Sequence, residues 1–367
     1  EMTSSLVGSE MCIRDSLNRR NVNFRRTGTM NKLVKKIAAV ALSVVMVGGA
    51  FAGCSASNDG AKADKKSFKV GICQLVTHDA LDAATKGFED KLTELGEANG
   101  VTFEFDYQNA SGDSTNCTTI ANKFVSSNYD LILANATAPL QACATATAAS
   151  KIPVIGTSVT DYGTALDIQM DPTGTTGINV TGTCDLAPLD KQAQQILDLF
   201  PNTKKVGAIY CSAEANSKYQ VDGIKSALAE KGVDCEFYAF SDSNDISAVA
   251  KKAASESDVI YIPTDNTAAS NGAVIDSACT EANVPIIAGE EGIFNNTKAV
   301  STLSISYYSI GQKAGEMAYD ILVNGKDPAT MNIAQTDELT YYYNADQAAK
   351  FSANIPDGYQ AYEAKAE

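Results

Sequence analysis

Short apolar stretches bounded by polar turns recur along the chain from about residue 68. They lie at 68–75, 101–107, 129–134, 153–156, 205–211, 234–240, 258–263 and 285–288. Such runs are typical of buried strands, whereas the segments between them show helical spacing. Leu81, Ala84, Phe88, Leu92 and Leu95, for example, fall on one helix face. This alternation predicts an α/β fold with parallel sheets and right-handed crossovers.

The pattern occurs twice, with matching segments in the same order. "KGFEDKLTELGEANGVTFEFDY" matches "DGIKSALAEKGVDCEFYAF", and "IANKFVSSNYDLILANATAPLQA" matches "VAKKAASESDVIYIPTDNTAASN". "SKIPVIGT" likewise matches "ANVPIIAG". We therefore predict two similar Rossmann-like lobes. Because open parallel sheets bind ligands outside the carboxyl ends of their strands, two facing lobes would form a binding cleft.

Composition agrees with two domains and argues against a nucleic-acid partner. The chain has 367 residues, of which 44% are hydrophobic, enough for two cores. Its formal net charge is −15, so a basic surface for DNA or RNA is not expected.

The N-terminal region predicts export and a lipid anchor. Residues 1–29 contain "SSLVGSEMCIRDS", which resembles a translated adapter, and we interpret them as a non-native leader. Residues 30–53 carry a lysine-rich start, an apolar run and small residues before Cys54, as a lipoprotein signal peptide does. Residues 54–67 are polar and form a flexible tether. The alternative is ordinary cleavage near Ala52, which leaves Cys54 as a free thiol.

The cysteines predict neither a disulfide scaffold nor a metal site. Seven follow Cys54, at positions 73, 117, 143, 184, 211, 235 and 279. Their number is odd, and they show no C-x-x-C or other metal-ligand spacing. We expect small buried hydrophobic residues, although oxidation of one pair stays open. No metal and no cofactor is expected.

A carboxylate follows one buried strand in the segment "YIPTDNTAAS". At the matching point of the repeat, the first half has neutral Asn135 and Thr137, whereas the second half has Asp265. The scaffold itself does not require this charge, which favours a role for Asp265 in ligand binding. The alternative is that Asp265 caps the helix that follows, which contributes about 1 kcal/mol.

Six segments together resemble the solute-binding proteins of bacterial ABC importers, in particular the group with tryptophan- and tyrosine-binding members. They are "VGICQLVTHDALD", "YQNASGDSTN", "GTSVTDYGTALD", "NVTGTCDLAP", "GAIYCSAEANSKYQ" and "YIPTDNTAAS". The resemblance covers 68 to about 360. It implies a type 1 periplasmic-binding-protein fold, with lobe one at 68–184 plus 308–330 and lobe two at 185–307 plus 331–367. A three-segment hinge near 183–187, 304–308 and 328–333 would join the lobes and allow them to close on the ligand.

The resemblance also implies an amino-acid ligand, whose ammonium would meet a carboxylate and whose carboxylate would meet N–H groups and hydroxyls. Asp265 is our first candidate for the ammonium partner, and Asp161 is the second. Helix N-termini near Thr137, Ala138, Ser212 and Asn216 suit a carboxylate. The remaining candidates lie in the loops that follow predicted strands: Gln74, Thr77, His78, Thr264, Asn266 and Glu291.

These features predict a monomeric, lipid-anchored protein that delivers a small ligand to an ABC permease and ATPase outside the cytoplasm. Aromatic or other hydrophobic amino acids are the first ligand class, and peptides or sugars are the alternatives. A lipid-anchored sensor of the same fold also stays open. We do not expect an enzyme, because the chain lacks the G-x-S-x-G, P-loop and H-E-x-x-H motifs and has a single histidine, His78.

Overall fold

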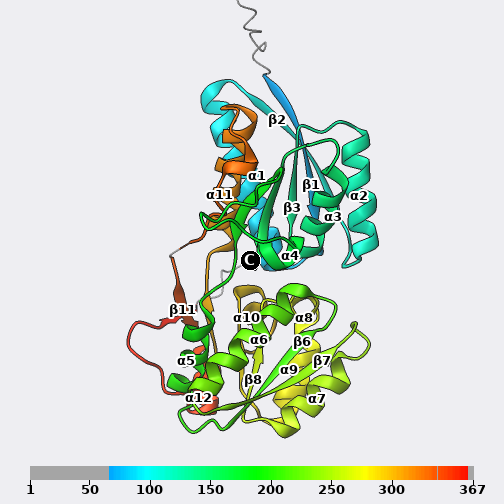
Figure 1. Ribbon diagram of the computed structural model, residues 1–367. Helices are drawn as coiled ribbons and strands as arrows, with labels where there is room; N and C mark the ends of the chain where they lie inside the picture. The colour runs from blue at the N-terminus through cyan, green and yellow to red at the C-terminus, as the bar shows by residue number, and fades with distance from the viewer. Residues whose placement is uncertain (1–65, 337, 363–367) are drawn as a thin grey trace, which may run out of the picture. The chain divides into compact units, whose positions relative to one another are not determined.

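A computed structural model describes residues 66–336 and 338–362 (Figure 1). The predicted leader, signal peptide, lipidation site Cys54 and most of the tether lie outside the described residues. Within them the fold is α/β, with one five-stranded and one seven-stranded sheet. All strand pairs are parallel except β10 with β11.

The first lobe is built on a sheet with the strand order β2-β1-β3-β4-β5. Its strands are β1 (Ser67–Gln74), β2 (Thr102–Asn109), β3 (Leu131–Asn135), β4 (Val154–Val159) and β5 (Val180–Cys184). Its helices are α1 (Asp79–Asn99), α2 (Ser114–Ser126), α3 (Thr137–Thr147), α4 (Tyr162–Leu166), α11 (Tyr307–Leu322) and the 3-10 turn η1 (Pro328–Thr330). Separate apolar cores form on the two faces of the sheet.

The second lobe repeats this order and extends it, with the strands arranged as β7-β6-β8-β9-β10-β11-β12. The strands are β6 (Lys205–Cys211), β7 (Asp234–Phe240), β8 (Val259–Ile262), β9 (Ile286–Ala288), β10 (Ser301–Ser304), β11 (Thr340–Tyr343) and β12 (Gln360–Ala361). The helices are α5 (Leu189–Leu199), α6 (Ala215–Glu230), α7 (Ile246–Glu256), α8 (Asn266–Ser270), α9 (Gly272–Ala282), α10 (Glu291–Asn296) and α12 (Ala345–Phe351). The predicted internal repeat is therefore confirmed by the sheet order.

Each of the eight predicted apolar runs overlaps an observed strand, while β5, β10, β11 and β12 were not predicted as strands. The chain crosses between the sheets after β5 and again after β10. The third crossing lies later than the expected 328–333, because Thr183 forms a parallel bridge with Ala334. The chain therefore stays with the first sheet to residue 334 and reaches the second at β11.

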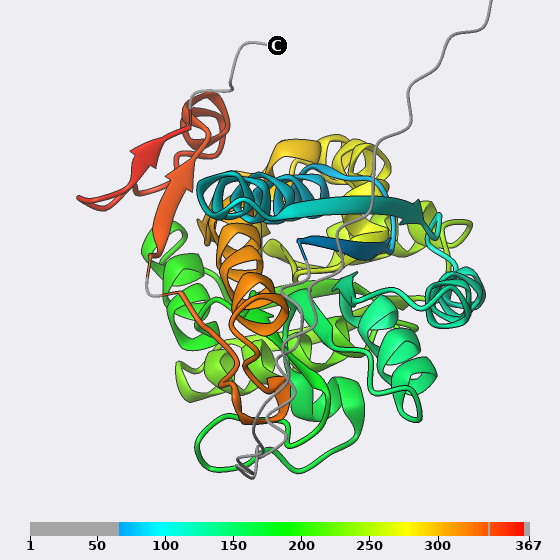
Figure 2. The ribbon, with the colours of Figure 1, turned by 90° about the horizontal axis from the view of Figure 1, so that it is seen from above.

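Helix α11 follows the second crossing and completes the first lobe by packing along α1 (Figures 1 and 2). The approach is close because glycines face the partner backbone. A Cβ placed at Gly87 would lie 2.1 Å from Tyr308 O, and one at Gly311 would lie 2.0 Å from Ala84 O. Only glycine fits these two positions without separating the helices.

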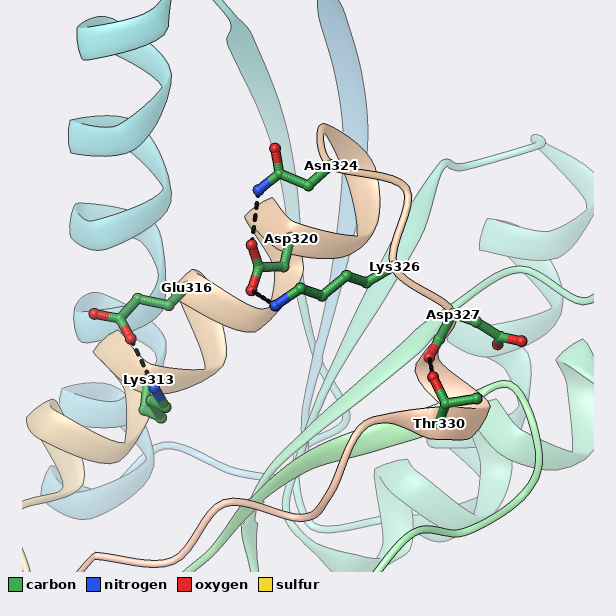
Figure 3. A network of polar contacts seen from close by, with 7 residues as sticks. All are labelled: Lys313, Glu316, Asp320, Asn324, Lys326, Asp327 and Thr330. Carbon is green, nitrogen blue, oxygen red and sulfur yellow. Dashed lines mark hydrogen bonds and ion pairs between the residues drawn. The ribbon is translucent and has the colours of Figure 1, made fainter.

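Polar contacts fix the turn that follows α11 (Figure 3). Asp320 accepts hydrogen bonds from Asn324 Nδ2 and Lys326 Nζ, each at 2.7 Å. Thr330 Oγ1 donates to Asp327 O at 2.9 Å within η1. These bonds direct the chain from α11 back to the edge of β5, where Ala334 N donates to Gly182 O at 2.8 Å.

The seven cysteines of the described residues are buried free thiols. Cys73, Cys117 and Cys143 belong to one apolar core of the first lobe, in agreement with their prediction as small buried hydrophobic residues. Within the same described ranges, none of the helices has the length and apolar character needed to span a membrane.

The contact between α1 and α11 yields a stability prediction. Gly311→Ala should lower the free energy of unfolding by about 2–3 kcal/mol, because the added methyl group meets backbone atoms that cannot rotate away. Urea unfolding would measure this loss.

Gly223→Ala in α6 is the matched control. Its added Cβ meets only Cδ1 of Leu189, the end of a flexible side chain. Since alanine favours a helix by about 1 kcal/mol over glycine, this variant should stay within about 1 kcal/mol of wild type. Equal losses in the two variants would contradict the assigned backbone contact.

Candidate functional site

Loops at the carboxyl ends of the strands of the two lobes contact each other. His78 Nε2 lies 3.2 Å from Asn266 Oδ1, and Gln220 Nε2 donates to Thr160 Oγ1 at 3.0 Å. Beside these contacts is a crevice with walls from both lobes, which in this structure is too narrow to hold a water molecule. Its lining residues are Thr137, Asp161, Thr164, Ala165, Ala215, Asn216 and Tyr219. We take this pocket and the surrounding loops as the candidate site.

Asp265, the first candidate for the ammonium partner, is buried and caps α8. Its Oδ1 accepts from Ala268 N at 2.8 Å, and its Oδ2 accepts from Cys211 N at 2.6 Å. Burial raises the pKa of Asp265 well above its usual value, and the neighbouring Glu214 adds to this shift. The alternative interpretation of Asp265 as a helix cap is therefore confirmed. Its pairing with an ammonium stays a prediction.

Sequence analysis did not select Glu214, although it lies between Ser212 and Asn216 in the segment "CSAEANS". Glu214 Oε1 accepts from Thr267 N at 2.8 Å and from Thr267 Oγ1 at 2.7 Å. Its Oε2 accepts from Asn266 Nδ2 at 2.7 Å and from Asn216 Nδ2 at 3.0 Å. Glu214 thus fixes two of the predicted site residues, Asn216 and Asn266, and occupies the N-terminus of α8.

Asp161, the second candidate for the ammonium partner, lies directly in the pocket lining. Its Oδ1 accepts from Thr164 N at 2.7 Å and so caps α4. Its Oδ2 has no hydrogen-bond partner among the described residues, and the side chain is only half-buried. Of the two aspartates, Asp161 is the one with an uncommitted oxygen.

Two helices begin at this pocket without a side-chain cap. Neither the side chain of Ala136, before α3, nor that of Glu214, before α6, accepts a bond from a backbone N–H in the first turn of its own helix. The predicted residues Thr137 and Ala138 belong to the first turn of α3, and Asn216 belongs to the first turn of α6. Uncapped N–H groups are the usual partners of an anion.

Ala136 holds the start of α3 in a strained conformation. Its φ of 100° and ψ of 168° fall in a region that glycine adopts and other residues avoid. The residue is fully buried, and its N–H donates to Thr157 O at 3.0 Å, which ties α3 to β4.

His78 is buried at the start of α1. Asn266 donates its Nδ2 to Glu214, so its Oδ1 must accept from His78, which places the imidazole proton on Nε2. Nδ1 is then a buried acceptor without a partner in the described part of the chain. Burial lowers the pKa of His78, which keeps the ring neutral.

Gln74 and Thr77 have structural partners in the first lobe. Gln74 Nε2 donates to Asp82 Oδ1 at 2.6 Å, and its Oε1 accepts from Thr85 Oγ1 at 2.7 Å. Thr77 Oγ1 accepts from Asn109 Nδ2 at 2.9 Å. These bonds connect β1 and the loop after it to α1 and β2. Neither residue lines the pocket.

Ser212 and Thr264 organise the loops of the second lobe. Ser212 Oγ donates to Phe240 O at 3.1 Å. Thr264 N donates to Gln220 Oε1 at 3.1 Å, and Thr264 O accepts from Asn216 Nδ2 at 2.9 Å. Thr264 therefore positions α6, whereas Ser212 connects the loop after β6 to the end of β7, and neither residue lines the pocket.

Glu291 lies elsewhere, in a separate cavity of about 860 Å³ that Asp79 and Tyr362 also line. Its neighbour Glu290 caps α10 by accepting bonds from Gly292 N and Ile293 N. Burial raises the pKa of Glu290 to about 8. The structure thus separates Glu291 from the pocket that contains Asp161.

Of the predicted site residues, the structure brings Thr137, Asp161 and Asn216 together around one pocket. Tyr219, which sequence analysis did not select, also lines it and is half-exposed. It lies on α6 one helical turn after Ala215, and this spacing is the signal that could have found it. The described residues contain no cluster of side chains suited to a metal ion.

Two parallel α/β lobes that meet at the carboxyl ends of their strands define a ligand-binding protein of the periplasmic type. The profile of the family "ABC transporter substrate binding protein" matches residues 69–366, and the chain belongs to this family. A relative from Clostridioides difficile (strain R20291), named "Tyrosine-binding protein", is 36% identical over 321 residues, 86% of this chain and 90% of the relative.

Two solved structures are also similar. The ABC domain from Streptococcus pneumonia in complex with L-Trp is 29% identical, covers 80% of this chain and 99% of its own, and has a TM-score of 0.75. The ligand-free, open structure of CD0873 from Clostridium difficile, a substrate binding protein with adhesive properties, is 33% identical. It covers 81% of this chain and 100% of its own, with a TM-score of 0.62.

The structural role of Asp265 can be tested in ligand-free protein. Asp265→Ala should lower the free energy of unfolding by about 2–3 kcal/mol, since it removes a helix cap and leaves the buried N–H of Cys211 without an acceptor. Asp161→Asn keeps the cap and should change stability by no more than about 0.5 kcal/mol. An unchanged stability of Asp265→Ala in urea unfolding would refute this role.

Ala136→Gly should raise the free energy of unfolding by about 1 kcal/mol, because glycine adopts the observed φ and ψ without strain. The control is Ala134→Gly in the neighbouring strand β3, where φ is ordinary. The free energy of unfolding of that variant should fall by about 0.5–1 kcal/mol. Chemical denaturation of both variants measures these changes. A lower free energy of unfolding in both variants would rule out backbone strain at Ala136.

Proposed function

We propose that this protein captures a free amino acid, preferably an aromatic one, between its two lobes and delivers it to an ABC importer. It performs no catalytic step. The lobes separate to admit the ligand, because the pocket between them has no room for it in the present arrangement, and the ligand then binds with its charged ends between Asp161 and the first turns of α3 and α6.

The arrangement of charge in that pocket carries the proposal. A carboxylate with one uncommitted oxygen, Asp161, lies beside two helix N-termini that lack side-chain caps. An amino acid has the complementary charges, an ammonium for Asp161 and a carboxylate for the N–H groups of the helices. A sugar has no charged groups that would use either feature.

Asp161 is a better ammonium partner than Asp265. Both oxygens of Asp265 accept backbone N–H groups, and the N-terminus of α8 is further occupied by Glu214. A ligand that paired with Asp265 would compete with bonds that hold the second lobe together. Asp161 binds an ammonium while keeping its cap on Thr164.

Two side chains suit an aromatic ligand. The half-exposed ring of Tyr219 lines the pocket and offers a stacking surface. Outside the pocket lining, Nδ1 of His78 is a buried acceptor without a partner in the described part of the chain, and separation of the lobes would open it to an N–H or O–H group such as those of an indole or a phenol. Relatives named for tyrosine binding and for a complex with L-Trp support the same ligand class.

The arrangement of the lobes supports capture by closure. The L-Trp complex has the higher TM-score, 0.75, although the open, ligand-free relative has the higher identity, 33% against 29%. A lobe arrangement closer to that of the liganded relative would account for this difference.

The N-terminal sequence supports a function outside the cytoplasm. Lipid attachment at Cys54, after removal of the signal at 30–53, would hold the binding lobes close to an ABC permease. The protein would act there as a monomer.

The proposal is tested by titrating refolded, ligand-stripped protein with the twenty amino acids and a sugar panel. At about 100 times its dissociation constant, a true ligand adds roughly 2.7 kcal/mol of stability, seen as a rise in melting temperature. We expect tryptophan, tyrosine or phenylalanine to give the largest rise. Asp161→Asn should weaken this binding at least tenfold, as loss of a charge-assisted bond predicts.

Asp167→Asn is the matched control, because it removes the same charge from the exposed end of α4 and should leave binding unchanged. Stabilisation by sugars alone would refute the amino-acid ligand. Full affinity in Asp161→Asn would refute the assigned ammonium partner.

A further inference from the structure

A buried carboxyl lies where the two lobes and two of their crossings meet. Asp185 directly follows β5 and is 2% exposed. Its Oδ2 accepts from Tyr307 OH at 3.0 Å, and its Oδ1 accepts from Thr160 Oγ1 at 3.2 Å. Tyr307 begins α11 at the second crossing, and Thr160 follows β4, so three separate segments converge on one carboxyl group.

Gln220 connects this group to the second lobe. It lies on α6, is 1% exposed, and donates its Nε2 to Thr160 Oγ1 at 3.0 Å. Its Oε1 accepts from Thr264 N at 3.1 Å. Because Thr160 belongs to the first lobe, this chain of hydrogen bonds exists only while the lobes are in contact.

Among the described residues, no cation compensates Asp185. The titratable groups that face it are Tyr307, Tyr162 on α4, Cys184 on β5 and Glu290 at the start of α10. Not one of these carries a positive charge, and Glu290 is a second buried carboxyl. None of the ion pairs between described residues includes Asp185.

We propose that Asp185 is a positioning residue that couples closure of the lobes to the uptake of a proton, so that the ligand is held more tightly in mildly acidic surroundings. This inference rests on the proposed function, since it assumes that the lobes close on a ligand. It adds a regulation of the same site by pH.

The direction of the pH dependence follows from the burial of Asp185. In the closed structure, burial raises its pKa to about 6. When the lobes separate, Gln220 and Glu290 move away with the second lobe, water reaches the carboxyl group, and its pKa falls towards the usual value of about 3.9. The closed form then binds the proton more tightly. This contribution is complete below the open-state pKa and is lost as the pH rises through about 6.

The dissociation constant of the best aromatic ligand should therefore increase between pH 5 and pH 7, by about tenfold for a single group of this kind. Isothermal titration calorimetry near pH 5.5, in two buffers of different ionisation enthalpy, should show net uptake of a fraction of one proton on binding. A dissociation constant that is flat over this range in wild type, with no proton uptake, would overturn the proposal.

Asp185→Asn keeps an oxygen to accept the bond from Tyr307 but cannot titrate. Its dissociation constant should stay nearly constant between pH 5 and pH 7. Asp167→Asn is the matched control, because it makes the same change at an exposed carboxylate that does not face Asp185 and should keep the wild-type pH dependence. An unchanged pH dependence in Asp185→Asn would overturn the proposal even if wild type shows one. If Asp185→Asn fails to fold, the proton uptake of wild type on ligand binding still tests the coupling.

Ligand-free protein separates this inference from the proposed function. Small-angle X-ray scattering should give a smaller radius of gyration at pH 5 than at pH 7 in wild type, and no change in Asp185→Asn. If no amino acid binds, the proposed function fails while the scattering still tests the coupling. If amino acids bind without any pH dependence or proton uptake, only the coupling fails.

Discussion

The carboxylates between the two sheets must find hydrogen-bond donors without the help of cations. In the described part of the chain, no ion pair involves Asp161, Asp185, Glu214, Asp265 or Glu290. Most of them accept backbone N–H groups at the starts of helices, which satisfies a buried carboxylate and fixes the loop that carries it. Asp161 keeps one oxygen uncommitted, which is why we propose it as the partner of a ligand ammonium.

The fold could be predicted from the sequence to a large extent because its signals are local. The eight apolar runs correspond to strands, and the repeated segments correspond to two sheets of the same strand order. Two of the missed strands, β10 and β11, were missed for a physical reason. β10 spans only Ser301–Ser304, and three of its four residues are polar. β11 shows no alternation in "TYYY", so neither strand has a hydrophobic period.

The site could be predicted only as a set of loops. Spacing located Asp161, Thr137 and Asn216 at strand ends, which the structure brings together. It could not show that the carboxylate of Asp265 is used by Cys211 N, because that bond joins residues 54 apart in sequence. For the same reason Asp185 did not stand out, since its partners Tyr307 and Thr160 come from other segments.

The contact between α1 and α11 also determines when the first lobe can form. Gly87 and Gly311 meet only after more than half of the chain has been made, and the whole second sheet up to β10 lies between them in sequence. On the ribosome, the second lobe can therefore assemble its central strands while the first still lacks one of its helices. Such a contact of high sequence separation slows folding. The first lobe to be synthesised therefore stays incomplete until the central strands of the second lobe have been made.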